Sequence, residues 1–270
     1  MSVQITTAFV EQYKANVLHL AQQKGSKLRD AVRTETVTGK AHFFERIGST
    51  AAQKRTSRHS DTPRMDTPHS RRKVSMDDYD WADLIDNEDK VRMLISPTSE
   101  YAMAGAWAMG RAMDDAIIAA ATGTAYSGVA GGTSVSLPSG QKVAHASGGL
   151  TVTKLISAKE VLDAADIDPD EPRFLVCAAG QVADLLAITQ VTSSDYNTVK
   201  ALASGQIDTF LGFKFIRSQR LGTDSTPSRQ CLAFTKSAIG LAVGADISTK
   251  ISERADKNYA TQVFLSMTIG

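Results

Sequence analysis

Apolar and small residues recur without a break from Ser96 to Gly123, and this pattern predicts the longest helix of the chain. Ser96 can cap the first turn with its hydroxyl group, and Pro97 suits the first helical position, where a missing N–H costs nothing. We expect Gly123 to end the helix in the left-handed conformation. At ~1.5 Å per residue, such a helix is roughly 40 Å long.

Bulky and small side chains share the surface of this predicted helix. Trp107 and Met113 offer large apolar contacts, whereas Gly110 allows another backbone to approach closely. The charged residues that interrupt the apolar run are Glu100, Arg111, Asp114 and Asp115. Because charges are costly inside a bilayer, we predict a rigid helix covered by other protein elements, and no membrane partner.

Before this helix, the chain changes from an arm to an unusually polar hairpin. Residues 1–40 include one short amphipathic helix, which must dock on something because a single apolar stripe is not stable alone. Lys40–Gly48 and His69–Met76 are rich in β-forming residues and are predicted to pair as strands. The connection between them, Thr50–Pro68, is nearly free of large apolar residues, and a connection of this length is usually functional or mobile.

Charge is segregated along this region. The hairpin is basic, with Lys54, Arg55, Arg58, Arg64, Arg71, Arg72 and Lys73. The next stretch is acidic, with Asp77, Asp78, Asp80, Asp83, Asp86, Glu88 and Asp89. The two groups could neutralise each other within one chain or pair between neighbouring copies, where complementary charge fixes register. We favour pairing between copies, because the polar hairpin has nothing of its own to bury. The candidate inter-subunit contacts are Arg55, Arg58, Arg64, Arg71, Arg72, Lys73, Asp77, Asp78, Asp83 and Asp86.

The pattern beyond the long helix mixes short strands with short helices. The glycine- and serine-rich residues 123–149 predict loops and short edge strands, and Leu150–Ala165 predicts a helix that Thr151 or Thr153 can cap. The apolar run Phe174–Ala178 is typical of a strand buried on both faces. Further helices are expected at Gln181–Ile188 and Asn197–Ser204, and further strands at Phe210–Ser218, Cys231–Thr235, Ile239–Ala245, Ile247–Arg254 and Tyr259–Ile269. The fold class is therefore α+β, with strands that regular crossover helices do not separate.

Composition limits the compartment and the partners. The 270 residues are enough for one elaborate domain or two small ones, and a net charge of +1 favours no particular partner. Cys177 and Cys231 are the two cysteines of the chain, which indicates a reducing compartment and buried, unreactive thiols rather than a disulfide framework. The N-terminus lacks the apolar segment of a secretory signal, so we expect synthesis in the cytosol.

The sequence offers little evidence of catalysis. It contains no phosphate-binding, dinucleotide-binding, zinc-protease or nucleophile-elbow pattern, and no His at metal-ligand spacing from another His or Cys. The adjacent carboxylates Asp114 and Asp115 could perform acid–base chemistry. We instead expect them to face different directions, with one paired to Arg111 a turn away. The sequence therefore predicts no enzyme activity, no cofactor and no metal site.

Several segments together carry a resemblance to a known family. WADLIDNEDKVRMLISPTSEY, which begins at Trp81, runs into AWAMGRAMDDAIIAAATG, and PRFLVCAAGQVADLLAI is followed by SGQIDTFLGFKFIRSQRL. With the closing ADISTKISERADKNYATQVFLSMTIG, these segments resemble the major capsid protein of tailed bacteriophages, which has the Hong Kong 97-type capsid fold. The likeness covers most of the chain and depends mainly on the order of its elements.

The resemblance implies a domain plan. Residues 1–40 would be an N-terminal arm, 41–92 an extended hairpin loop that reaches a neighbouring subunit, 93–169 a peripheral domain with the spine helix 96–123, 170–240 an axial domain, and 241–270 the closing strands of the peripheral domain. Trp107, Gly110 and Met113 would be the packing positions of the spine helix.

The resemblance also implies a function and partners. It predicts a major capsid protein that assembles with itself, as pentamers and hexamers, into an icosahedral head shell around double-stranded DNA. Because arm and hairpin take up the residues before Ser96, it implies a separate scaffolding protein, together with a portal protein and packaged DNA on the inner face. The expected location is the virion, after synthesis in the host bacterial cytoplasm. Two alternatives stay open: an encapsulin-type nanocompartment shell, and a nucleic-acid-binding module that uses the basic hairpin.

Overall fold

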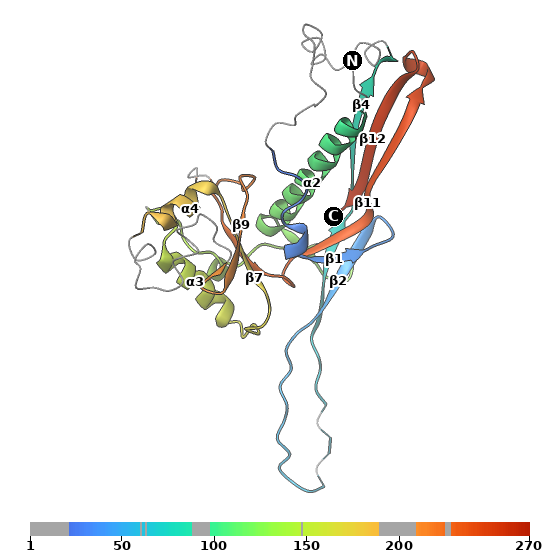
Figure 1. The fold of residues 1–270 in the computed structure, drawn as a ribbon. Coiled ribbons are helices and arrows are strands. Elements are labelled where there is room, and N and C mark those ends of the chain that lie inside the picture. Colours follow the sequence, from blue (N-terminus) through green and yellow to red (C-terminus); the bar gives the residue numbers. More distant parts are fainter. Residues whose placement is uncertain are drawn as a thin grey trace.

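The computed structural model describes residues 22–59, 61–62, 64–87, 98–146, 148–188, 209–224 and 228–270. These residues form a mixed α+β fold with three four-stranded sheets (Figure 1). The predicted arm helix, the predicted cap at Ser96 and Pro97, and the predicted helix at Asn197–Ser204 lie outside the described residues.

The long helix, α2, covers Thr98–Thr122 and lies along the first sheet. That sheet has the order β1-β11-β12-β4, with β1 at Arg33–Thr36, β11 at Gly240–Arg254, β12 at Ala260–Ile269 and β4 at Asp77–Ile85. β1 runs parallel to β11, and the other neighbours are antiparallel. Along most of β12 every second residue is buried, as expected for a strand with one face on a core.

The main core lies between α2 and this first sheet. Its most buried members, each at most 3% exposed, include Met109, Met113 and Ile117 of the helix and Val263, Leu265 and Met267 of β12. At Gly105, an added Cβ would lie 2.6 Å from the indole of Trp81 on β4 and 2.7 Å from the side chain of Leu265. Small residues therefore let the helix lie close to the sheet.

The second sheet contains the predicted hairpin. β2 at Ala41–Ile47 and β3 at His69–Ser75 pair antiparallel, which confirms the two predicted strands. β3 also pairs with β5 at Ala125–Ser127, which in turn pairs with β6 at Thr133–Val135. Beyond the strands, a 2.8 Å backbone hydrogen bond from Gly48 to Pro68 closes the hairpin stem. The described side chains of the loop past this bond are exposed, and Figure 1 shows the loop extending far from the rest of the molecule.

The third sheet forms a module with two helices, and its Phe174, Val176 and Phe234 also belong to the main core. Its order is β10-β7-β9-β8, with β10 at Leu232–Thr235, β7 at Arg173–Cys177, β9 at Phe213–Arg217 and β8 at Thr209–Phe210. β7 is buried along its whole length, as predicted, and packs with α3 at Val152–Asp163 and α4 at Ala179–Leu186. Of the two predicted caps, Thr151 begins α3 by accepting the N–H of Lys154 at 3.4 Å. Short 3-10 turns lie at Arg29–Ala31, Ser139–Gln141 and Ala255–Lys257.

The structure differs from the expectations at three places. Gly123 does not have a positive φ; its amide donates to the carbonyl of Ala119 at 2.8 Å, so a backbone bond to the last turn replaces the left-handed end. The two strands predicted between Ile239 and Arg254 are one continuous strand, β11, whose pairing with β12 is irregular near Ala245. Residues 77–85, which the domain plan places in the hairpin, form β4 in the sheet beside α2.

The segment that precedes β1 crosses α2 at Gly110. An added Cβ at Gly110 would lie 2.5 Å from the Cα of Gly25 and 2.6 Å from the amide nitrogen of Ser26. Gly25 itself has a φ of +76°, a left-handed conformation that glycine adopts without strain. The expectation that Gly110 admits another backbone is therefore confirmed, and the backbone belongs to the same chain.

Replacing Gly110 with Ala should destabilise the protein, although Ala is the better helix former. The clash involves backbone atoms, which no rotamer change relieves, and overpacking of this kind costs about 1–3 kcal/mol. Gly180 in α4 is the matched control, because a Cβ there would meet no atom within 4 Å, so Gly180→Ala should be neutral or stabilising. Denaturant unfolding of both variants measures the difference. A Gly110→Ala protein as stable as the wild type would contradict the close crossing.

Candidate assembly site

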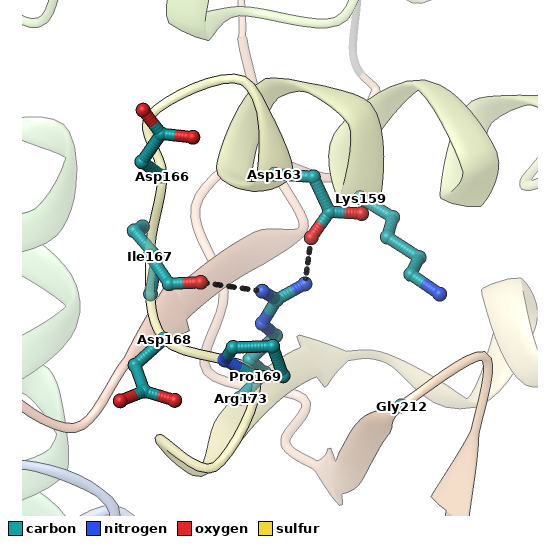
Figure 2. A pocket seen from close by; sticks show the side chains of 8 residues that line it. All are labelled: Lys159, Asp163, Asp166, Ile167, Asp168, Pro169, Arg173 and Gly212. Carbon is teal, nitrogen blue, oxygen red and sulfur yellow. Dashed lines mark hydrogen bonds and ion pairs between the residues drawn. The ribbon is translucent and has the colours of Figure 1, made fainter.

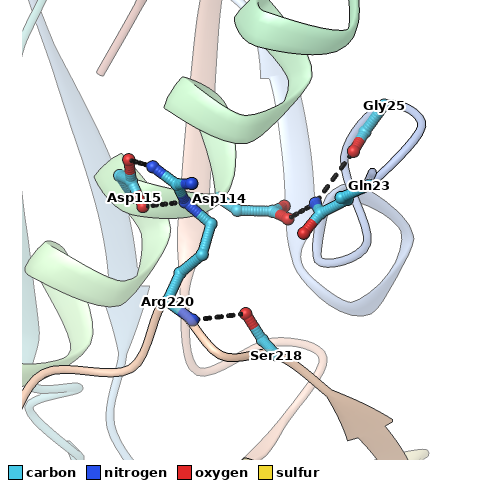
Figure 3. A network of polar contacts seen from close by, with 6 residues as sticks. All are labelled: Gln23, Gly25, Asp114, Asp115, Ser218 and Arg220. Carbon is cyan, nitrogen blue, oxygen red and sulfur yellow. Dashed lines mark hydrogen bonds and ion pairs between the residues drawn. The ribbon is translucent and has the colours of Figure 1, made fainter. Parts of the chain in front are cut away.

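A buried carboxylate on α2 holds the N-terminal segment in place. The side chain of Asp114 is fully buried. It accepts the backbone N–H groups of Lys27 and Leu28 at 3.1 Å and the hydroxyl of Ser26 at 2.6 Å. It also accepts the side-chain amide of Gln23 at 2.5 Å (Figure 3). A buried charge is costly unless its oxygens are hydrogen-bonded, and these donors supply the bonds. Asp114 thus fixes this segment on the helix.

The next residue, Asp115, points to a different part of the molecule. Its carboxylate makes a two-point contact with the guanidinium group of Arg220, which follows β9 (Figure 3). This hydrogen bonding raises the pKa of Arg220. The ammonium group of Lys27 donates to the backbone oxygen of Arg217 at 2.9 Å, so the N-terminal segment also touches the end of β9. We call the contacts of Asp114, Asp115, Lys27 and Arg220 the joint, because the N-terminal segment, α2 and the third-sheet module meet there.

The two carboxylates face different partners as expected, but the predicted pairing with Arg111 is wrong. Arg111 donates to the side-chain oxygen of Gln22 at 3.0 Å and to the backbone oxygen of Gln23 at 3.1 Å. An ion pair within one helix stabilises it by only about 0.2–0.5 kcal/mol, so partners from other segments prevail. These contacts bind segments of the chain together.

The three predicted packing positions of the helix all contact their own chain. Met113 is buried in the main core, and Gly110 is crossed by the N-terminal segment. Trp107 is half-buried, and the ammonium group of Lys24 lies 5.5 Å from the centroid of its ring. A cation at this distance from an aromatic face is attracted to it.

Contacts within the chain also fix the root of the hairpin. Arg71 forms a 2.8 Å ion pair with Glu45, its partner across β2 and β3, and its guanidinium carbon lies 5.3 Å from the ring centroid of Phe43. Arg72 and Lys73 lie in the part of β3 that pairs with β5. These three basic candidates therefore help to set the direction in which the hairpin projects.

The loop beyond the root carries the other basic candidates, Arg55, Arg58 and Arg64, and all three are exposed. Arg55 donates to the backbone oxygens of Ser57 and Arg58, which stabilises a local turn. The largest apolar side chain of the described loop, Met65, is 42% exposed. The loop therefore gains little stability from burial in its own chain.

The acidic candidates lie on or next to β4, the strand at one edge of the first sheet. Asp77 is exposed, and Asp78 accepts the hydroxyl group of Thr268 at 2.7 Å. Asp83 accepts the next backbone N–H at 2.9 Å, and Asp86 is half-buried just past the strand. In the described part of the sheet, β4 pairs with β12 alone, so its other edge is open. An open strand edge with carboxylates beside it is available to a partner.

The basic loop and the acidic strand do not meet within the described part of the chain. The ion pairs found there join other residues, and none connects the hairpin to β4. Figure 1 shows why: the loop points away from α2 and from the far end of β4. Neutralisation within one subunit is therefore not observed among these residues.

A hollow of about 560 Å³ lies at the end of α3 (Figure 2). Its lining residues are Lys159, Asp163, Asp166, Ile167, Asp168, Pro169, Arg173 and Gly212. The buried Arg173 donates to the carboxylate of Asp163 at 2.6 Å and to the backbone oxygen of Ile167 at 3.3 Å, which ties the end of α3 to the start of β7. No Ser, Cys or His is among these lining residues. Across the described ranges, no cluster of three His, Cys, Asp or Glu residues could hold a metal ion, and no helix is long and apolar enough to cross a membrane.

Sequence reasoning missed the partners of Asp114 and the roles of Arg173 and Arg220. The signal for Asp114 was present, because it shares a helical face with Gly110 and Ile118, four residues before and after it. A carboxylate on an apolar face needs donors from elsewhere. No local pattern marks Arg220 as the residue that reaches Asp115, because the two are far apart in sequence.

The structure thus combines a long helix against an open sheet, a projecting hairpin and an α/β module, and comparisons with known proteins identify its family. A family model described as phage capsid protein matches residues 5–270. The chain therefore belongs to the phage capsid protein family, and this family places it in the virion. A comparison with curated proteins finds no match. Membership of this structural family favours a phage shell over the encapsulin-type alternative and indicates a structural rather than an enzymatic role.

Solved phage structures share the fold. The capsid structure of the Cyanophage P-SCSP1u matches with a TM-score of 0.70 and 20% identity, over 98% of this chain and 89% of that chain. The capsid of Ralstonia phage GP4 matches with a TM-score of 0.69 and 10% identity, over 97% and 90%. A structure of Mycobacterium phage Che8 matches with a TM-score of 0.68 and 16% identity, over 97% and 92%. The predicted capsid protein with a mixed α+β fold is confirmed.

The joint predicts unequal effects for two isosteric changes. Asp114→Asn replaces an accepting oxygen by an amide group, so donor hydrogens face the buried donors of residues 23–28. The groups left unpaired should lower the free energy of unfolding by about 2–3 kcal/mol. Asp115→Asn removes a contact that is nearly half exposed, and pairs of this kind contribute about 0–1 kcal/mol. Denaturant unfolding of the two variants gives both values. Equal losses would show that Asp114 does not carry the attachment of the N-terminal segment.

Proposed function

We propose that the chain forms a Hong Kong 97-type shell in which the hairpin of each subunit docks on a neighbouring subunit. In this plan, the N-terminal arm ends at residue 40 and adds its strand β1 to the first sheet. The other strands of that sheet form the peripheral domain with α2, and the third-sheet module is the axial domain. One observation carries the proposal: the loop between Gly48 and Pro68 projects from the body with exposed side chains and a fixed root.

The stability of such a loop supports contact with another subunit. Ordering each residue of a loop costs about 1–2 kcal/mol of backbone entropy. The described loop does not offset this cost by burying apolar surface in its own chain. A neighbouring subunit offers the surface that the loop lacks, and the fixed root aims the loop at it.

Charge supports a particular receptor, the acidic strand β4. Arg58 and Arg64 are exposed in the loop, and Asp77 and Asp80 are exposed on the strand. Each exposed pair contributes only about 0–1 kcal/mol, but a shell repeats every contact at each subunit. In this arrangement Arg55 shapes the loop, the basic residues of the root set its direction, and Asp78, Asp83 and Asp86 add negative charge around the contact.

We propose the remaining partners by analogy with other phage capsids. They are further copies of the chain in pentamers and hexamers, a separate scaffolding protein, a portal protein, and double-stranded DNA on the inner face. The place of synthesis is the cytoplasm of a bacterial host. None of these partners depends on which acidic surface receives the hairpin.

Charge reversal tests the contact. The double change Arg58→Glu with Arg64→Glu should prevent closed shells, because each loop then repels its receptor, while each subunit stays folded. Asp77→Lys with Asp80→Lys should cause a similar defect, and combining all four changes should restore some assembly. Electron microscopy counts closed shells, and circular dichroism checks that the subunits remain folded.

The matched control reverses two exposed charges elsewhere, Lys142→Glu with Lys236→Glu. It changes the net charge as much as the double arginine variant does, and it should leave assembly intact. Assembly of the wild type should weaken with salt, since exposed charges are screened beyond ~10 Å at 0.1 M. Normal shells from both double variants at low salt would refute the charge contact. Contact with packaged DNA would then be the better explanation of the loop arginines.

A further inference from the structure

The two cysteines lie opposite each other on neighbouring strands of the third sheet. β7 and β10 are antiparallel, and their register pairs Val176 with Leu232. One step further along this register, Cys177 at the end of β7 faces Cys231, the residue before β10. Residues that face each other in a sheet point to the same side, so both thiols lie on one face.

Backbone hydrogen bonds show which kind of pair the cysteines form. The carbonyl of Cys177 accepts the N–H of Ser218, which follows β9, at 3.0 Å. The carbonyl of Pro172 accepts the N–H of Lys236, past the other end of β10, at 3.2 Å. The side to which a strand residue directs its backbone groups alternates, so Cys177 directs its groups to β9 and away from β10. Cys177 and Cys231 are therefore a non-hydrogen-bonded pair, for which Cα atoms lie about 4.5 Å apart, within the range of about 4.4–6.8 Å that disulfides need.

The surroundings of the thiols slow their reactions but leave the two groups close to each other. Cys177 is fully buried, Cys231 is half-buried, and both are free thiols in the same apolar cluster. Burial raises the pKa of Cys177 to about 12 and that of Cys231 to about 11. Among the charged neighbours, Arg217 lowers the pKa of Cys177, while Asp184 raises and Lys154 lowers that of Cys231. The thiol of Cys231 also raises the pKa of Cys177, so the two groups are close enough to interact.

We propose that Cys177 and Cys231 are a disulfide-forming site, closed by thiol–disulfide exchange with a small-molecule disulfide when the protein meets an oxidising environment. First, the half-buried Cys231 gives its proton to water, and its thiolate attacks one sulfur of the small disulfide, which releases one small thiolate. Next, Cys177 loses its proton and attacks Sγ of Cys231, which releases the second small thiolate. The two protein thiols lose two electrons and two protons, and the small disulfide takes them up as two thiols.

The bond would join β7 to β10 and close the segment 178–230, which includes α4 and β9. A crosslink of this kind restricts the unfolded chain more than the folded chain, so it stabilises the module. Both cysteines belong to one subunit. The site is therefore independent of the hairpin contact, and a failed test of either proposal leaves the other intact.

The experiment incubates the purified, folded full-length protein with oxidised glutathione and then blocks remaining thiols with iodoacetamide. Peptide mass mapping without reductant should find one peptide pair that contains Cys177 and Cys231, lighter by about 2 Da than the two free thiols. The oxidised protein should unfold at a higher temperature than the reduced protein, and reductant should abolish the difference. Cys177→Ser is the matched control and should yield only a glutathione adduct at Cys231.

The pH dependence gives a second readout that needs no variant. The rate of linkage should rise about tenfold per pH unit from pH 7 to 9, because the thiolate fraction of a high-pKa thiol grows by that factor. In the unfolded protein, where a cysteine has an ordinary pKa of about 8.5, the rate of thiol–disulfide exchange should stop rising near pH 9. Separate glutathione adducts on both cysteines, links between different subunits, or no link in the folded protein would overturn the proposal.

Discussion

A buried carboxylate must have its oxygens hydrogen-bonded, and at Asp114 this requirement fixes how the parts of the subunit meet. Its donors come from the segment around Ser26, so the chain that leads into β1 is held across α2 at Gly110. One residue further along, the helix turns a side chain by about 100°, and Asp115 faces the third-sheet module, where it holds Arg220. Two consecutive residues of one helix therefore contact two other parts of the subunit, and α2 lies between them.

The hairpin differs from the buried carboxylate, because its described loop does not bury its side chains in its own chain. Its root is fixed, because Arg71 pairs with Glu45 and the aromatic ring of Phe44 packs on the backbone of Gly240. Its loop is exposed and rich in arginine, and the acidic strand β4 presents the complementary charge on another side of the molecule. The described part of one subunit does not bring the two together, and the proposed shell would do so at every neighbour. Weak contacts suffice in a shell because the same contact forms at every subunit when the shell closes.

The sequence predicted those elements whose stability depends on local pattern. The length of α2, the two strands of the hairpin, the cap at Thr151 and the buried strand β7 follow from periodicity, charge and capping residues. Prediction from the sequence failed where contacts between distant segments determine the structure. Arg111 contacts Gln22 and Gln23 rather than a carboxylate one turn away, and residues 77–85 join the sheet beside α2 because β12 offers them an edge to pair with. Among the candidate site residues, the pattern located the basic and acidic groups but not their separation in the folded subunit. Charge alone does not show which way a strand runs.

Electron cryo-microscopy of purified heads, at a resolution that resolves side chains, tests the central claim most directly. The reconstruction should show density for the loop between Gly48 and Pro68 lying across the next subunit, with Arg58 and Arg64 near the carboxylates of β4 in that copy. The joint at Asp114 and Asp115 should be the same in every copy, because it fixes the subunit rather than the contact. A loop directed to the packaged DNA or folded back on its own subunit would contradict the account.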